Sequence, residues 1–331
     1  MAFDNIKLEK GLYSTSKGFT ASLEELDPSE NYIGTDYEGL DAYQRQLKRF
    51  DIKVSGTGSD TISKFFQTTD SAALFPEYIS RAVQQGLEEE DILPKIVATT
   101  TMIDSLDYRA IESVPAGEDK ELVYVAEGAK IPETTVKTKD KLTRLHKRGR
   151  MLVASYEAIK FQKLDLFTVT LKQIGAYIAR TQLMDAINVI AANEDIETLS
   201  AKDTLSYEAL VKLWDSISPY HLSTLIATPT AIADMLAITE FKDSYAGQNF
   251  HGTGKMITPF GAEVLKMSNF DSKVVIAIDN SAAIEKVQAG NIVTEYDKLI
   301  DRQLERAAIT ATAGFSTIFS DAIKILEVTA D

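Results

Sequence analysis

The sequence predicts an α+β protein in which a long polar N-terminal segment precedes a globular part that begins near Ser71. Two observations predict this class. One is a helical stripe of apolar residues over residues 164–192, and the other is the alternation of apolar and polar residues, typical of strands, on both sides of it. The 331 residues suffice for about two domains, and 44% hydrophobic with 25% charged residues is the composition of a core-forming protein.

The N-terminal segment has the composition that is least typical of a globular domain. Residues 1–35 are polar, rich in serine, threonine, glycine and aspartate, and lack helical periodicity. We predict an extended arm that a neighbour must order. The small residues and glycines of VSGTGSD, residues 54–60, predict a hinge, so that the arm as a whole covers residues 1–72.

A short amphipathic helix is predicted inside this arm, over residues 36–50. Leu40, Tyr43 and Leu47 recur at helical spacing on one face, while the basic residues lie elsewhere. A helix of this kind usually docks on another surface, so these three residues are candidates for contact with a neighbouring subunit.

The globular part opens with a helix predicted over residues 76–90, where Pro76 suits the first turn because proline lacks the N–H that this position leaves unpaired. Residues 95–111 are threonine-rich and strand-like. Residues 120–140 then combine a strand, LVYVA, a polar crest, and a returning strand, VKTK, which predicts a long hairpin.

The clearest element is a helix over residues 164–192, which follows a basic strand over residues 142–155. No proline interrupts the helical stripe, whose apolar members are Leu164, Phe167, Leu171, Ile174, Ile178, Met184, Ile187 and Ile190. A helix of this length would measure about 40 Å at 1.5 Å per residue. That length is natural for a structural spine, and an ordinary core helix is the alternative.

After Ser200 helices and strands alternate, which predicts a separate α/β domain over residues 205–300. Its predicted elements include a helix that stops before Pro219 and a glycine-rich loop at residues 247–254. The last thirty residues return to strand character. We therefore predict that the first domain is discontinuous in sequence: the second domain is inserted into it, and the last strands belong to the sheet of the first domain.

The bulk composition excludes several function classes. A formal net charge of −14 is unfavourable for a free, sequence-specific DNA-binding protein, because phosphate contacts need a basic face. The absence of cysteine removes disulfides and thiolate chemistry. We see no signal peptide at the start and no apolar stretch long enough to span a bilayer, so we expect a soluble protein made in the cytoplasm, without membrane partners.

Residues with catalytic potential form no recognisable site. The loop GQNFHGTGKM at 247–256 fails as a phosphate-binding loop, because Asn249 and Met256 stand where glycine and a hydroxyl residue are needed. His146, His221 and His251 lack metal-ligand spacing, and the acidic run from Glu88 to Asp91 is better interpreted as a solvated face. We therefore predict no catalytic residue, no metal and no cofactor.

A basic cluster stands out in this acidic chain. Between residues 137 and 150 a single acid, Asp140, accompanies the cations Lys137, Lys139, Lys141, Arg144, Lys147, Arg148 and Arg150. The cluster predicts contact with something negative, either the acidic face of a neighbouring subunit or packaged DNA, and a merely solvated strand is the third possibility. Interleaved aromatic residues, which would indicate base stacking, are absent, so we favour a neighbouring subunit.

Several segments together resemble the Hong Kong 97-type major capsid proteins of tailed phages. LDYRAIES at 106–113 resembles the strand entering their extended loop, and AEGAKIPETTVKT at 126–138 is similar to the segment closing it. LVASYEAI at 152–159 resembles the turn before their spine helix. MITPFGAEVLKMSNF at 256–270 and ERAAITATAGFSTIFSDAIKILEV at 305–328 are similar to later segments of the family. The resemblance covers most of the chain from about residue 72.

This resemblance implies a Hong Kong 97-type fold with the following parts: an N-terminal arm over 1–72, a first peripheral part over 73–108, an extended β-hairpin loop over 109–141, a second peripheral part with the spine helix over 142–204, an α/β axial domain over 205–300, and closing peripheral strands over 301–331. The extended loop should lie across a neighbour. Its crest adds Glu127, Lys130, Ile131 and Pro132 to the candidates for subunit contact.

Some relatives weld their subunits through an isopeptide bond from a lysine just before the proline of the extended loop. Here Ile131 precedes Pro132, with Lys130 one residue away, and residues 303–310 show no asparagine and glutamate in register. We expect no covalent cross-linking. The N-terminal part lacks a long coiled-coil segment, so we expect no fused scaffold.

The implied function is assembly of an icosahedral shell around the double-stranded DNA of a tailed phage. The implied partners are further copies of the chain in pentamers and hexamers, a scaffolding protein, a portal protein, decoration proteins, and DNA bound without sequence specificity. The expected location is the virion capsid, assembled in the host bacterial cytoplasm. Two alternatives are an encapsulin-type compartment that encloses cargo enzymes, which the long N-terminal arm disfavours, and an unrelated soluble enzyme.

Overall fold

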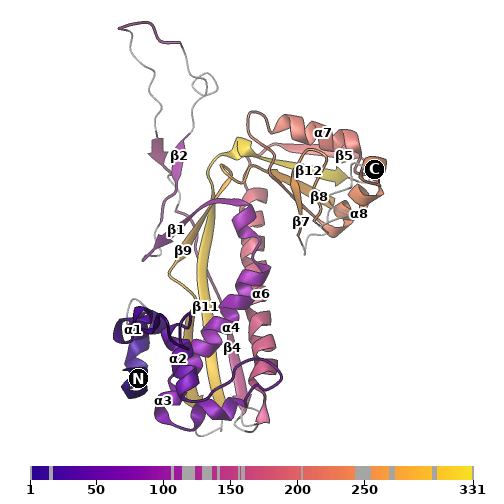
Figure 1. The fold of residues 1–331 in the computed structure, drawn as a ribbon. Helices are drawn as coiled ribbons and strands as arrows, with labels where there is room; N and C mark the ends of the chain where they lie inside the picture. The colour runs from indigo at the N-terminus through magenta and orange to yellow at the C-terminus, as the bar shows by residue number, and fades with distance from the viewer. Residues whose placement is uncertain are drawn as a thin grey trace. The chain divides into compact units, whose positions relative to one another are not determined.

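The computed structural model of the chain describes residues 2–14, 18–105, 108–113, 124–128, 136–139, 142–155, 157, 161–202, 204–242, 255–267, 273–299 and 304–329. The chain forms two compact units (Figure 1). Unit 1 consists of Met1–Asp91, Lys147–Arg180 and Asn291–Ala311, and unit 2 of Ile92–His146, Thr181–Gly290 and Thr312–Asp331. Both are assembled from separate stretches of sequence.

The N-terminal segment of unit 1 is helical, so the prediction of an extended arm was wrong. Its described residues form the elements η1 (Ala2–Asn5), η2 (Lys10–Ser14), α1 (Phe19–Leu26), η3 (Ser29–Tyr32), α2 (Ala42–Arg49), η4 (Ile62–Phe66), α3 (Thr69–Ala72) and α4 (Phe75–Glu90), where η marks a 3₁₀ turn. Phe19 and Leu23 of α1 are buried in the same core as Leu171 of helix α6. The segment is therefore part of a domain and is ordered by its own chain.

A buried ion pair explains how so polar a segment folds. The Arg45 side chain is fully buried, and its Nε donates to Asp27 Oδ2 at 2.7 Å. The Tyr32 hydroxyl donates a hydrogen bond to Asp27 Oδ1 at 2.6 Å. The Arg45 guanidinium lies over the Tyr32 ring, 4.4 Å from the ring centroid. Each of these three buried side chains thus has a partner, which offsets the cost of removing it from water.

The predicted hinge at residues 54–60 is a hydrogen-bonded turn. Lys53 N donates to Asp60 Oδ2 at 2.8 Å, and Asp60 N donates to Lys53 O at 2.9 Å. Ser59 inside the turn is buried. These bonds fix the entry and exit of the turn, so it connects the helices on either side in a defined geometry.

The two long helices of unit 1 confirm their predictions. Helix α4 begins with Pro76 in its first turn, and α6 (Leu164–Ala191) has 28 residues, the last of which belong to unit 2. In unit 1 the backbones of α4 and α6 meet at two glycines. A Cβ on Gly175 would lie 2.0 Å from Val83 O, and one on Gly86 would lie 2.1 Å from Lys172 O. Only hydrogen fits at either position.

Unit 1 also contains part of a sheet. Strand β10 (Val293–Leu299) pairs antiparallel with β11 (Leu304–Thr317), with Tyr296 opposite Ala307. The predicted basic strand is β4 (His146–Ser155), which pairs with β11. Leu152 and Ala154 of β4 pack against the core that contains Phe75, so one face of the strand is covered.

In unit 2, β1 (Val97–Ile103) pairs in parallel with β9 (Ile284–Ala289), and β9 pairs antiparallel with residues 313–317 of β11. A short turn, η5 (Leu93–Lys95), precedes β1. The predicted hairpin is present at its base, where β2 (Ile111–Ser113) pairs antiparallel with β3 (Val136–Thr138). The first strand of the hairpin is therefore residues 111–113 and not the predicted LVYVA at residues 122–126. Residues 114–123 and 129–135 lie outside the described residues.

The rest of unit 2 is the predicted α/β domain, with the strand order β5-β12-β8-β6-β7. Its strands are β5 (Thr198–Lys202), β6 (Thr224–Ala227), β7 (Glu263–Lys266), β8 (Lys273–Ile278) and β12 (Ile323–Thr329). Its helices are α7 (Tyr207–Ser216), α8 (Pro229–Ala237) and α9 (Thr239–Lys242), with the turn η8 (Ser320–Ala322) before β12. Ser206 and Thr228 cap α7 and α8 through their side-chain oxygens. The glycine loop at 247–254 lies outside the described residues.

Two predicted boundaries were wrong. Strand β12, predicted to close the peripheral domain within 301–331, instead lies between β5 and β8 in the α/β sheet. Strands β9 and β10, predicted inside the α/β domain at 205–300, pair with β11 instead. Over the described residues, no helix has the length and apolar character needed to cross a bilayer.

Candidate interaction surfaces

The described residues contain no constellation for metal binding: no three His, Cys, Asp or Glu side chains of this part of the chain come together. His146 starts β4, and His221 is exposed and uses its backbone N–H to bond Asp279 at 2.9 Å. His251 lies outside the described residues. These positions agree with the prediction of solvated or structurally satisfied histidines.

The shifted pKa values also follow from packing. Burial raises the pKa of the Tyr43 phenol well above its ordinary value and raises the pKa of Tyr78 to about 12. Burial opposes ionisation of Asp279, but hydrogen bonds from the Ser281 hydroxyl and the His221 backbone outweigh it and hold the pKa of that carboxyl below its usual range. Among these groups none is brought near neutrality, where general acid–base catalysts work best.

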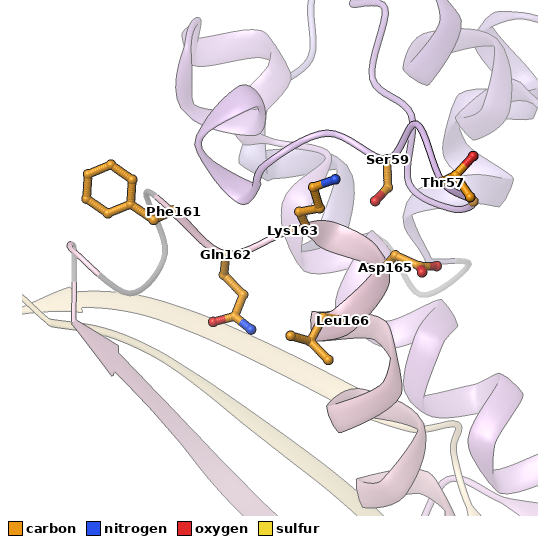
Figure 2. A pocket seen from close by; sticks show the side chains of 8 residues that line it. Thr57, Ser59, Phe161, Gln162, Lys163, Asp165 and Leu166 are labelled. Atoms are coloured by element: carbon orange, nitrogen blue, oxygen red, sulfur yellow. The ribbon is translucent and has the colours of Figure 1, made fainter.

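Figure 2 shows a pocket of about 480 Å³ beside the first turn of α6 in unit 1. Its lining residues are Gly56, Thr57, Ser59, Phe161, Gln162, Lys163, Asp165 and Leu166. The Phe161 ring points away from the other labelled side chains, and Lys163 and Asp165 are the charged members. The pocket has the volume of a small-molecule site but lacks converging acid–base or nucleophilic groups. It is a recess in the surface without evident chemistry.

The root of the predicted extended loop is anchored to unit 2 by a carboxylate. Glu285 on β9 is buried and accepts hydrogen bonds from Thr101 on β1 at 2.5 Å and from the Tyr108 hydroxyl at 2.6 Å. Burial and this hydrogen bond raise the pKa of Tyr108, so its phenol remains a proton donor. The residues on either side of β2 and β3 are tied down as well: Lys139 N donates to Ala110 O, and Thr143 N to Tyr108 O, both at 2.8 Å.

Replacing Tyr108 by phenylalanine is expected to cost about 1 kcal/mol, because it removes one hydrogen bond to a buried carboxylate. Hydrogen exchange of the Lys139 and Thr143 amides should accelerate in the isolated subunit. The matched control is Tyr207→Phe on α7, whose hydroxyl has no hydrogen-bond partner within the described residues. Equal exchange in the wild type and Tyr108→Phe would contradict an anchoring role.

The candidate contact residues of the loop have different environments. Glu127 is exposed. Lys139 is occupied within its own unit, since its Nζ donates to Thr317 O at 2.5 Å. Lys130, Ile131 and Pro132 lie outside the described residues, as does the side chain of Lys137. The absence of a covalent cross-link at Lys130 therefore stays a prediction.

Basic residues of β4 are accessible. Arg144, just before the strand, is exposed, and so are Lys147 and Arg150, while Arg148 is partly buried. The Arg150 guanidinium lies 5.8 Å from the ring centroid of the exposed Tyr177 on α6. We call residues 144–150 the cationic strand; its exposed cations Lys147 and Arg150 lie on opposite faces of β4.

The predicted contact face of the 36–50 helix is buried inside unit 1. Tyr43 and Leu47 on α2 are only 3% and 7% exposed and belong to the unit 1 core, and Leu40 is partly buried. The helix does dock, as predicted, but on its own chain. Tyr43 and Leu47 therefore offer no surface to a neighbour, and their assignment to subunit contact was wrong.

The acidic run at the end of α4 is likewise occupied within unit 1. Glu89 pairs with Lys172 at 2.7 Å, and Glu90 pairs with Arg180 at 3.3 Å, both on α6. Glu88 accepts from the Gln84 amide at 2.7 Å. The run therefore supports the packing of α4 on α6 and is not only the solvated face that was predicted.

A family model described as phage capsid protein matches residues 138–322, which is more than half of the chain. The chain belongs to the phage capsid protein family. The matched region of this capsid protein includes the cationic strand, the long helix and most of the α/β sheet. Family membership indicates a structural protein. No protein of curated function matches the sequence.

Solved structures share the fold of this capsid protein at low sequence identity. The capsid of Cyanophage P-SCSP1u is 11% identical with a TM-score of 0.51, covering 73% of this chain and 88% of that one. The capsid of a native GTA particle is 12% identical with a TM-score of 0.51, covering 75% and 91%. A structure from Gordonia phage Cozz is 12% identical with a TM-score of 0.50, covering 73% and 87%. The predicted fold and the predicted role as a structural, major capsid protein are confirmed.

Proposed function

We propose that this capsid protein assembles with further copies of itself, as pentamers and hexamers, into the icosahedral shell that encloses the double-stranded DNA of a tailed phage. The observation that carries the proposal is the match of a phage capsid family model to residues 138–322. The acidic net charge of −14 supports a protein that encloses DNA and does not grip it. Assembly takes place in the host bacterial cytoplasm, with a scaffolding protein, a portal and decoration proteins as partners.

The extended loop rooted at β2 and β3 is the part that reaches a neighbouring subunit. Its root is held by Glu285, while at the crest Glu127 and Tyr124 are exposed, the latter at 97%. An aromatic side chain so fully exposed in a single subunit supports burial against a partner. A rigid root with an exposed crest suits a segment that binds across a neighbour, and many modest contacts of this kind add up in a closed symmetric shell.

The cationic strand of β4 meets a neighbouring subunit in this proposal, and not the packaged DNA. Arg144, Lys147 and Arg150 are exposed, and so are the apolar side chains Met151 and Val153 of the same strand. Exposed apolar groups among cations favour a protein surface over a phosphate backbone, which gains little from apolar contact.

Electron microscopy of the full-length chain, produced together with the genes that neighbour it, tests the proposed function. We expect large shells filled with DNA, whose subunits run as monomers on a denaturing gel because no isopeptide bond forms. Small shells filled with cargo protein would favour the encapsulin alternative. A ladder of covalent oligomers would contradict the absence of cross-links, and the absence of any shell would overturn the proposal.

A further inference from the structure

The connection between α1 and α2 forms an exposed surface of a distinct chemistry. From Gly18 to Asp41 the sequence has no lysine or arginine. In this stretch Leu26 and Ile33 are 56% and 72% exposed, and the exposed carboxylates around them are Glu25, Glu30, Asp36 and Glu38. We call residues 25–38 the acidic knob. An apolar centre with a charged rim is the usual anatomy of a protein-binding surface.

The acidic knob is rigid before it meets any partner. Arg45 holds it from inside: besides Asp27, it donates to Ser29 Oγ at 2.9 Å and to Leu40 O at 2.6 Å. Glu24 closes the knob from the other end by accepting from Ser29 N at 3.0 Å and from Ala42 N at 2.6 Å. A preformed surface binds without the entropic cost of ordering a loop.

Strand β4 presents the complementary chemistry. From Arg144 to Ser155 the sequence has no carboxylate. Met151 and Val153 are 55% and 53% exposed and share a strand face with Lys147, since alternate residues of a strand point the same way. Within the described residues, Lys147 has no ion-pair partner, and the same holds for Glu30 and Asp36 of the acidic knob. Both surfaces thus carry charge that the single subunit leaves uncompensated.

We infer that the acidic knob of one copy docks on the exposed face of β4 in a second copy, with Leu26 and Ile33 against Met151 and Val153 inside a rim of opposite charges. The inference rests on the proposed function, because it names two surfaces through which subunits of the shell bind each other. The occupant of β4 is a second copy because the knob matches the strand in both charge and apolar content. Opposite potentials of this kind select the partner and its orientation.

Charge reversal tests the pairing in the full-length chain, with shells counted by electron microscopy and sedimentation. We expect the Lys147→Glu variant and the Glu30→Lys/Asp36→Lys variant each to lower the shell yield by about tenfold or more, since like charges placed opposite each other are strongly unfavourable. The combined variant should recover to within about threefold of the wild type. Its failure to recover, with both parents folded by circular dichroism, would overturn the pairing.

The matched control reverses exposed acids elsewhere. Glu208 on α7 and Glu240 on α9 are exposed, and Glu208→Lys/Glu240→Lys changes the net charge by the same amount as reversal in the knob. Its yield should stay within about twofold of the wild type, and the combination with Lys147→Glu should bring no recovery. Recovery with this control would show that total charge matters and not the pairing, and would overturn the inference.

Disulfide trapping tests the contact directly, because the chain has no cysteine of its own. The Ile33→Cys and Val153→Cys variants are co-assembled and oxidised. We expect a disulfide dimer in the mixed shells at a yield at least tenfold above that of either variant alone. Shells that form without this dimer would overturn the inference and leave the proposed function intact. Shells of Lys147→Glu that form normally but retain less DNA would overturn it in favour of a DNA-facing strand.

Discussion

Replacing Gly175 by alanine is expected to destabilise unit 1 by roughly 3–4 kcal/mol, near the upper end of what single substitutions cost. The added methyl would lie 2.0 Å from Val83 O and 2.5 Å from Leu87 N. Both contacts are with the backbone of α4, so no side-chain rotation can relieve them, and the two helices must move apart. The midpoint of guanidinium unfolding, followed by far-UV circular dichroism, should fall accordingly.

Gly58→Ala is the matched control, because a methyl group there meets no atom within 4 Å and the glycine does not have a positive φ. Its stability should remain within about 0.5 kcal/mol of the wild type or rise slightly. The single tryptophan, Trp214, lies in unit 2, so its fluorescence monitors that unit separately. An unchanged midpoint in Gly175→Ala would contradict the close approach of α4 and α6.

Replacing Asp27 by alanine is expected to cost about 3–5 kcal/mol, because it removes the buried counter-ion of Arg45 and leaves only the partly exposed Glu24, 3.7 Å away. Arg45 is fully buried and Asp27 is 1% exposed, so water cannot replace the lost carboxylate. Urea unfolding of the subunit should show the loss, and hydrogen exchange should locate it in residues 18–50. The double variant Asp27→Leu/Arg45→Met should be more stable than Asp27→Ala, since it removes the unpaired charge as well.

The control for this pair is Asp297→Ala, which breaks the exposed ion pair with Arg306, 2.7 Å long. Exposed pairs contribute between zero and about 1 kcal/mol, so little change is expected. If Asp27→Ala were as mild as this control, the buried pair would not be what organises the N-terminal helices.

Elements with local signals were predictable from the sequence. The stripe from Leu164 to Ile190 predicted α6 within a residue or so of its ends, because most of its members are buried. The first part of the stripe, to Ile178, packs in the core of unit 1, and Ile187 and Ile190 pack in a core of unit 2. The strand–helix alternation that predicted the α/β domain is of the same kind. The cationic strand was predictable too, since both its strand-like alternation and its positive charge come from residues that follow one another in the sequence.

Elements fixed by distant partners were not predictable. Residues 1–35 have the composition of a disordered arm, and the contacts that fold them, such as Arg45 with Asp27 at 2.7 Å and Arg81 with Thr20 at 2.8 Å, join positions 18 and 61 residues apart. One local signal was available: Asp41 and Gln44 form a capping box that marks the start of α2. Tyr43 and Leu47 were assigned to contact with a neighbouring subunit because amphipathicity shows that one face of a helix is buried, but not whether the same chain or another chain buries it.

The position of β12 sets the order in which a newly made chain can become a finished subunit. Strand β5 reaches the rest of its sheet through β12, which pairs with it in parallel and with β8 on the other side. A ribosome that has translated β5, β6, β7 and β8 has still produced a sheet with a gap beside its edge strand β5, and the facing edges of β5 and β8 stay unpaired until Ile323–Thr329 emerges. A nascent chain that lacks these residues cannot complete the sheet, so synthesis of β12 is a checkpoint before a subunit can be incorporated into a shell.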